Sequence, residues 1–302
     1  MAVINHKLVS YIHWVRNRLI AGLDRHLANC GICRQVARAD LPGQTSILGG
    51  GKAKDLVEQE LLPSNMGSII INTMPKSGSV YIAAALQAGL GLSPIQIHNM
   101  YFPDDVVNIN AFKEWASGAQ ITQSHLSSTE LNIWLLGSFV DRMIVHVRDP
   151  REATLSWVHF IERMYQENPF ELLRIPYVHP EYFMGLTFSE RVDWAIDHHL
   201  PILVGWVDGW IKYSQKDVSE QPFRVLFTTY PELVNDETVL FAKICDFFDV
   251  PDGMFVSPNI DKTEAVYFRK GQPGEWRKVF TAEQAQRATD ACKCILDHFS
   301  WQ

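Results

Sequence analysis

The hydrophobic pattern separates a strand-and-helix region, from residue 67 to the C-terminus, from the chain that precedes it. Short apolar segments of the kind buried on both faces of a parallel sheet alternate there with amphipathic helical patterns. The predicted extended segments are 69–73, 121–126, 143–147 and 224–229. Long crossovers between such strands favour parallel pairing with helices on both faces. We therefore predict one α/β domain over residues 67–302, with a central parallel sheet flanked by helices.

Apolar spacing and end signals predict the helices of this domain. They are expected after the first strand up to Gly91, from Pro150 onward, over 189–216, over 238–248, and from a capping box of Thr281 and Gln284 to the end. Residues 92–119 are predicted to be irregular. Residues 168–188 are rich in proline and aromatic residues, and we interpret them as a loop over a cavity.

Residues 1–66 are predicted to form a separate N-terminal helical extension. Leucine, isoleucine and valine recur at three- and four-residue spacing between Leu8 and Leu27, which is typical of an amphipathic helix. One interpretation is a helix packed on the main domain. The other is a docking helix for a partner or a membrane surface, which Arg16, Arg18 and Arg25 would suit.

Two short patterns suggest other chemistry but lack its requirements. Cys30 and Cys33 have the spacing of half a zinc site, but the second candidate pair, Cys292 and Cys294, is closer together than usual, so unreactive thiols are the preferred interpretation. The segment 43–52 ends in three glycines and a lysine. It lacks the first glycine of a nucleotide phosphate loop and the hydroxyl residue after the lysine, which favours a flexible loop.

Charge and composition restrict the partners and the compartment. The formal net charge of -7 argues against a general nucleic-acid binder or anionic-membrane binder, which would normally be basic. No apolar run approaches the roughly 18 residues of a membrane span, and no signal peptide is evident. Five cysteines, an odd number, fit a reducing compartment. We expect a cytoplasmic protein that does not bind nucleic acid and does not span a membrane.

The segment Pro75-Lys76-Ser77-Gly78-Ser79 carries the main candidate chemistry. A strand, a tight loop and a helix start bring backbone amides and a helix N-terminus toward an anion. Gly78 lets the backbone approach that anion, and Lys76 supplies a positive charge. In the phosphate loops of nucleotide triphosphatases the lysine follows the last glycine. Here the lysine comes first, so a different family of anion-binding loops is indicated.

Four ordered motifs resemble those of sulfotransferases that use 3′-phosphoadenosine 5′-phosphosulfate (PAPS). The loop at 75–79 resembles their 5′-phosphosulfate loop, and His125 lies in a segment similar to the one that holds their catalytic base. Val147 to Pro150, with Ser156, resembles their 3′-phosphate segment. Residues 268–276 resemble their late Arg-Lys-Gly loop. The resemblance covers residues 68–281 and implies a sulfotransferase of P-loop-like fold, with PAP as the second product and no metal requirement.

The resemblance also implies roles for individual residues. His125 would be the general base, because a neutral imidazole accepts a proton near pH 7, and Lys76 would stabilise the leaving phosphate. The nucleotide-binding set would be Lys76, Ser77, Gly78, Ser79, Val80, Tyr81, Arg148, Ser156, Tyr230, Phe268, Arg269, Lys270 and Gly271. Within it, Arg148, Ser156, Arg269, Lys270 and Gly271 would hold the 3′-phosphate.

Some positions depart from the family pattern. Val80 stands where a second threonine is common, Tyr81 replaces a tryptophan, and Gln123 replaces a lysine. The C-terminal dimerisation motif is altered as well, which leaves the oligomeric state open.

The acceptor is expected to be a small molecule, such as a secondary metabolite, sulfated on oxygen or nitrogen. Phe102, Phe160, Tyr177 and Tyr182 lie in segments expected to wall an apolar acceptor pocket. Two other functions stay open: a P-loop-type nucleotide kinase, and a non-catalytic nucleotide-binding or docking module. The lysine position argues against the first, and Lys76 together with His125 argues against the second.

Overall fold

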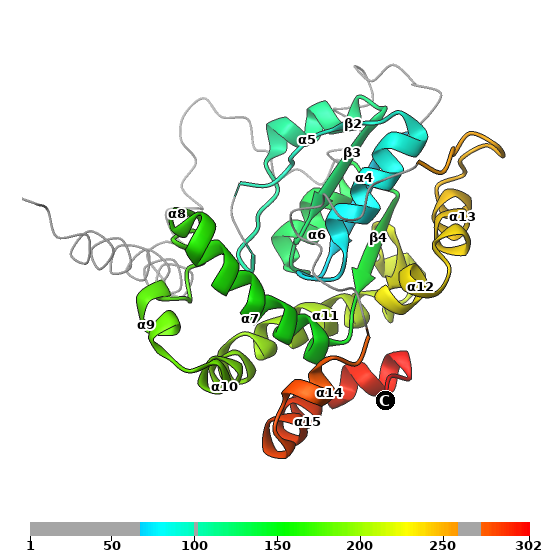
Figure 1. The fold of residues 1–302 in the computed structure, drawn as a ribbon. Coiled ribbons are helices and arrows are strands. Elements are labelled where there is room, and N and C mark those ends of the chain that lie inside the picture. The colour runs from blue at the N-terminus through cyan, green and yellow to red at the C-terminus, as the bar shows by residue number, and fades with distance from the viewer. Residues whose placement is uncertain (1–66, 100–101, 259–272) are drawn as a thin grey trace, which may run out of the picture.

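The computed structural model describes residues 67–99, 102–258 and 273–302. The strands of these residues form one five-stranded sheet in the order β2-β3-β1-β4-β5, and every neighbouring pair is parallel (Figure 1). The strands are β1 (Ile69–Thr73), β2 (Ser93–Pro94), β3 (Gln120–Ser124), β4 (Arg142–Val147) and β5 (Arg224–Thr229). The predicted α/β class with a central parallel sheet is confirmed. The predicted helical extension, 1–66, lies outside the described residues.

Helices cover both faces of the sheet (Figure 1). The helices of the described residues are α4 (Ser79–Leu90), α5 (Ile109–Ala116), α6 (Glu130–Gly137), α7 (Pro150–Glu167), α8 (Pro169–Leu172), α9 (Pro180–Gly185), α10 (Phe188–His198), α11 (Leu200–Ser214), α12 (Tyr230–Asn235), α13 (Glu237–Phe247), α14 (Trp276–Val279) and α15 (Ala282–Phe299), with a 3₁₀ turn at Val218–Glu220. None of the helices among the described residues is long and apolar enough to cross a membrane.

Alternation along β1 explains the two layers. All five residues of this strand are buried. Ile70 packs into a cluster with Trp206 and Trp210 of α11, whereas its neighbours Ile69 and Ile71 pack on the other face against α4 and α13. Because successive side chains of a strand point to opposite faces, a continuous apolar run is what a doubly covered strand requires.

Several predicted boundaries were wrong. Residues 189–216 form two helices, because Pro201 lacks a backbone N–H and starts a new helix, α11, after the junction at His199. Residues 168–188, predicted as a loop, contain the short helices α8 and α9. The segment 92–119, predicted to be irregular, contains β2 and helix α5, whose N-cap is Asn108. The capping box of Thr281 and Gln284 is confirmed at the start of α15.

Candidate active site

The loop after β1 presents backbone amides at the carboxyl end of the sheet. Lys76 and Gly78 both have positive φ angles, 65° and 90°, which give the loop its tight turn. The hydroxyl of Ser77 donates to the carbonyl of Met74 at 2.6 Å and closes the turn from inside. Helix α4 then begins at Gly78 with no side-chain cap. Its first amides therefore have no side-chain acceptor, which suits the binding of an anion.

Glycine is required at position 78 for two reasons. Its φ of 90° is a conformation that residues with a Cβ rarely adopt. A Cβ there would also lie 3.1 Å from a methyl carbon of Leu233 and 3.3 Å from the ring of Tyr230. The loop thus packs directly on helix α12, which fixes its height above the sheet.

Two residues from β4 and its end hold this loop from below. His146 is fully buried, and burial lowers its pKa to about 4, so the imidazole is neutral. Its Nε2 donates to the carbonyl of Ser77 at 2.9 Å, and its Nδ1 accepts from the hydroxyl of Thr228 at 2.8 Å. Arg148 donates from Nη1 to the carbonyl of Lys76 at 3.1 Å. The loop is therefore tied to β4 and, through Thr228, to the edge strand β5.

The guanidinium of Arg148 is also anchored on its other sides. Its Nε and Nη2 contact one carboxylate oxygen of Glu152, each at 3.0 Å, and its plane lies 4.1 Å from the ring centroid of Tyr230. Three of its five N–H groups are occupied in this way, and the other two have no partner among the described residues. Ser156 lies two turns further along the chain, half-buried on α7. Arg148 is thus held in one position with capacity for another anion.

His125 directly follows β3, and hydrogen bonds fix its ring and its backbone. Its Nδ1 donates to the carbonyl of Thr73 at 2.6 Å, which leaves a lone pair on Nε2. The amide of Gln123 faces that nitrogen at 3.4 Å. The indole of Trp206 donates to the carbonyl of His125 at 3.1 Å and holds its backbone. Burial is the main cause that lowers the pKa of His125, so its neutral, proton-accepting form is favoured.

Aromatic residues surround the space between His125 and Lys76. The ammonium of Lys76 lies 4.4 Å from the ring centroid of Phe160. Phe102 is edge-on to His125, with the ring centroids 6.2 Å apart. The positive charge of Lys76 also contributes to lowering the pKa of His125, so the two groups are within electrostatic range of each other. A cation, a base and apolar walls thus meet at one place.

Residues 67–257 match the family described as "Sulfotransferase domain". The chain belongs to the sulfotransferase domain family. The match begins two residues before β1 and includes the loop at 75–79, His125 and Arg148.

Solved structures that are similar to this sulfotransferase share little sequence with it. A mouse sulfotransferase, SULT7A1, solved with PAP, is 17% identical, covers 84% of this chain and 92% of its own, and has a TM-score of 0.47. The sulfotransferase domain from the curacin biosynthetic pathway is 15% identical over 76% of this chain and 97% of its own, with a TM-score of 0.44. A sulfotransferase from Alicyclobacillus acidocaldarius is 11% identical over 78% and 97%, also at 0.44. No curated protein matches the chain.

The remaining predicted nucleotide residues of the sulfotransferase lie at the same edge or outside the described residues. The hydroxyl of Tyr81 donates to Glu237 at 2.7 Å, and Val80 is exposed at the start of α4. Tyr230 is buried beneath Arg148 and Gly78. Phe268, Arg269, Lys270 and Gly271 are in the segment 259–272, which the structure does not describe.

Of the predicted acceptor residues, Tyr177 lies near Phe102, whereas Tyr182 lies apart from the others. The hydroxyl of Tyr177 is 2.9 Å from Nδ1 of His199, and His199 in turn lies near Phe102. Tyr182 is exposed on α9, and no contact among the described residues joins it to the others. The neighbouring Phe183 is the buried residue, in a cluster with Trp157.

Sequence reasoning missed several supports of this site. His146 could have been recognised as a polar residue inside an otherwise apolar strand. Glu152 follows Arg148 by four residues and so shares its side of the helix start. His199 gave no local signal, because its partner Tyr177 is 22 residues away in the chain.

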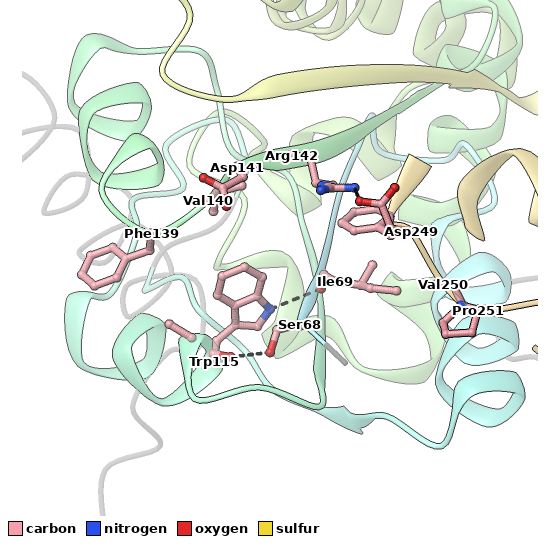
Figure 2. Close-up of a pocket in the computed structure, with 13 residues that line it drawn as sticks. Ser68, Ile69, Trp115, Phe139, Val140, Asp141, Arg142, Asp249, Val250 and Pro251 are labelled. Atoms are coloured by element: carbon pink, nitrogen blue, oxygen red, sulfur yellow. Dashed lines mark hydrogen bonds and ion pairs between the residues drawn. The ribbon is translucent and has the colours of Figure 1, made fainter. Parts of the chain in front are cut away.

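A cavity of about 370 Å³ lies at the opposite, amino end of the sheet (Figure 2). Its lining includes Ser68, Trp115, Phe139, Arg142, Asp249 and Pro251. The polar side chains shown there are paired: the Trp115 indole donates to the carbonyl of Ile69 at 3.2 Å, and Arg142 contacts Asp249. We refer to it below as the amino-end cavity.

Proposed function

We propose that this sulfotransferase transfers the sulfuryl group of PAPS to a hydroxyl or an amine nitrogen of a small-molecule acceptor. The observation that carries the proposal is the orientation of His125. A hydrogen bond from Nδ1 to the Thr73 carbonyl, at 2.6 Å, places the lone pair on Nε2, whose contact with the Gln123 amide is long, at 3.4 Å. A protein that only bound a nucleotide would need no base at this position.

The donor set of the carboxyl end fits a nucleotide with phosphates at both ends. The amides of Ser77 to Val80, the Ser79 hydroxyl and Lys76 would hold the 5′-phosphosulfate. Arg148, with two N–H groups left, and Ser156 would hold the 3′-phosphate, together with Arg269, Lys270 and the Gly271 amide from the undescribed segment. Tyr81 would stack on adenine, while Tyr230 would support Arg148 and Phe268 would border the nucleotide.

The reaction is an in-line displacement at sulfur. The acceptor oxygen or nitrogen forms a bond to sulfur and passes its proton to Nε2 of His125. The bond between sulfur and the donor's phosphate oxygen breaks, and both electrons leave with that oxygen, which gives PAP and the sulfated acceptor. Lys76 and the loop amides stabilise the charge that develops on the leaving phosphate.

The same loop residues give less support to the alternative function, a nucleotide kinase. A P-loop kinase places its lysine after the last glycine and a magnesium-binding hydroxyl directly behind it. Here Lys76 precedes Gly78. Because protein cations would neutralise the leaving group, we expect activity to persist in EDTA, and loss of turnover that magnesium restores would favour the kinase.

Nucleotide binding measured by calorimetry tests the proposal. PAP should bind at least about 100-fold more tightly than AMP or ATP, because each charge-assisted hydrogen bond to the 3′-phosphate contributes about 1.5–3 kcal/mol. Arg148→Ala should remove most of that preference; AMP affinity should fall as well, but by much less, because Arg148 also holds the Lys76 carbonyl of the loop. The matched control, Arg142→Ala at the amino-end cavity, should keep it. Equal affinity of the wild-type protein for PAP and AMP would refute the proposed donor.

A further inference from the structure

His199 is a buried polar side chain with one unused nitrogen. It lies at the junction of α10 and α11 and is fully buried. Its Nδ1 is 2.9 Å from the hydroxyl of Tyr177. Its Nε2 is also buried and has no hydrogen-bond partner among the described residues. Because buried polar groups are nearly always paired, an unpaired one indicates a ligand that completes it.

The imidazole of His199 belongs to the same aromatic space as His125. It stacks on Trp157 with the ring centroids 4.1 Å apart, and Trp157 directly follows Ser156 on α7. Its other aromatic neighbour is Phe102, which lies edge-on at 6.4 Å and is also edge-on to His125 at 6.2 Å. The charge of Lys76 contributes to lowering the pKa of both histidines. The two imidazoles therefore approach one aromatic ring and one ammonium group.

The protonation of the pair determines what this nitrogen can bind. Burial lowers the pKa of His199 to about 3, so its ring is neutral. Burial also raises the pKa of Tyr177, which keeps its proton. When the Tyr177 hydroxyl donates a hydrogen bond to Nδ1 of the neutral imidazole, the ring carries its own proton on Nε2. His199 then offers one N–H donor, and its matching partner is an oxygen lone pair.

We propose that His199 is an acceptor-binding residue that donates from Nε2 to a second oxygen of an aromatic acceptor, while the reacting group of that acceptor lies at His125. Tyr177 is the positioning residue that fixes the tautomer of His199. The aromatic character follows from the rings of Phe102 and Phe160 beside His125 and Lys76, against which a flat ring packs well. This inference rests on the proposed function and deepens it by naming the acceptor class.

Matched acceptors test the proposal with the full-length protein and PAPS. The probes are naphthol, which has one hydroxyl, and the dihydroxynaphthalene isomers, which add a second. The wild-type protein should use at least one isomer with a kcat/KM about tenfold above that of naphthol, since a site built to bond a hydroxyl discriminates against its absence. His199→Phe keeps a ring against Trp157 and should reduce the preference to within about twofold. The fall in kcat/KM should be larger for that isomer than for naphthol.

Two further variants separate binding from folding. His198→Phe alters the exposed neighbouring histidine and should keep the wild-type preference. The double variant His199→Phe, Tyr177→Phe avoids an unpaired tyrosine hydroxyl, and it should show the same loss of preference as His199→Phe. A His199→Phe protein that retains the wild-type preference overturns the inference. So does one in which naphthol and dihydroxynaphthalene turnover fall equally.

A binding measurement makes the result independent of turnover. Acceptor affinities are measured by calorimetry with PAP present, for naphthol and each dihydroxynaphthalene. If PAP binds far more tightly than AMP but the wild-type protein binds all these acceptors equally, the inference on His199 fails and the proposed function stands. If PAP is not preferred over AMP, the proposed function fails, whichever acceptor preference is found.

Discussion

The two ends of the sheet differ in how their polar groups are used. The amino-end cavity has a volume of about 370 Å³, but the N–H groups of Trp115 and Arg142 there donate to neighbouring protein groups. At the carboxyl end, the first amides of α4 have no side-chain cap and Nε2 of His199 has no partner among the described residues, while Nε2 of His125 has a long contact, 3.4 Å, with the Gln123 amide. Unused hydrogen-bonding capacity and displaced pKa values, rather than open volume, therefore mark the site.

The largest expected difference between the two ends is in turnover after removal of a cation. Lys76→Met should lower kcat by about 10³, because it removes charge stabilisation of the leaving phosphate. Arg142→Met, the same loss of charge at the amino-end cavity, should change kcat by less than about twofold. Initial rates at saturating PAPS and acceptor measure both. A comparable loss in the two variants would mean that the cavity takes part in the reaction.

The next effect concerns the base. His125→Ala should lower kcat by about 10² and leave PAP affinity nearly unchanged. Burial lowers the pKa of His125 below 6.5, so its base form is retained at neutral pH and is lost only as the pH falls through that lowered pKa. The wild-type pH profile of kcat should therefore have an acidic limb below 6.5 that His125→Ala abolishes. An unchanged limb in the variant would assign the titration to another group.

A third effect concerns stability in acid. The pKa of His146 is about 4 in the folded protein and about 6.5 when unfolded, so the unfolded chain binds a proton first. Stability should be complete above pH 6.5 and fall between pH 6.5 and 4, by up to about 3 kcal/mol from this residue. Denaturant unfolding over that range should show a shallower fall in the double variant His146→Leu, Thr228→Val. The exposed control His198→Leu should follow the wild-type curve, and an equal slope in all three would exclude His146 as the cause.

The smallest effect is expected at the surface ion pair of the amino-end cavity. Asp249 is largely exposed, so its pairing with Arg142 is screened by solvent. Asp249→Asn should change the free energy of unfolding by less than about 1 kcal/mol and leave kcat unaltered. A larger loss, measured by denaturant unfolding, would indicate that the pair supports the carboxyl end through β4.

The sequence was sufficient for features that depend on neighbours in the chain. The apolar run of β1, the first-turn proline at Pro150 and the capping box at Thr281 are local signals, and each has the predicted element in the structure. The order of lysine before glycine in the loop pointed to the family. Lys76, Arg148 and Tyr230 each follow a predicted strand, and the topology of a parallel sheet gathers residues that follow its strands at one edge.

Features that depend on distant partners could not be obtained in this way. His146 contacts Ser77, which is 69 residues earlier, and Thr228, which is 82 residues later. His199 pairs with Tyr177, which lies in the turn between α8 and α9, 22 residues earlier in the chain. The break between α10 and α11 is a different case, because Pro201 is visible in the sequence and its effect was underestimated.

Arg148 supports both halves of the proposed nucleotide site. Its guanidinium holds the Lys76 carbonyl from below and rests on Tyr230, the ring that also underlies Gly78. An anion that accepts hydrogen bonds from the other N–H groups of Arg148 therefore binds the same side chain that holds the loop in its shape. Contacts at the two ends of the nucleotide should be thermodynamically coupled, so the energies lost on deleting each alone will not add up to the loss on deleting both.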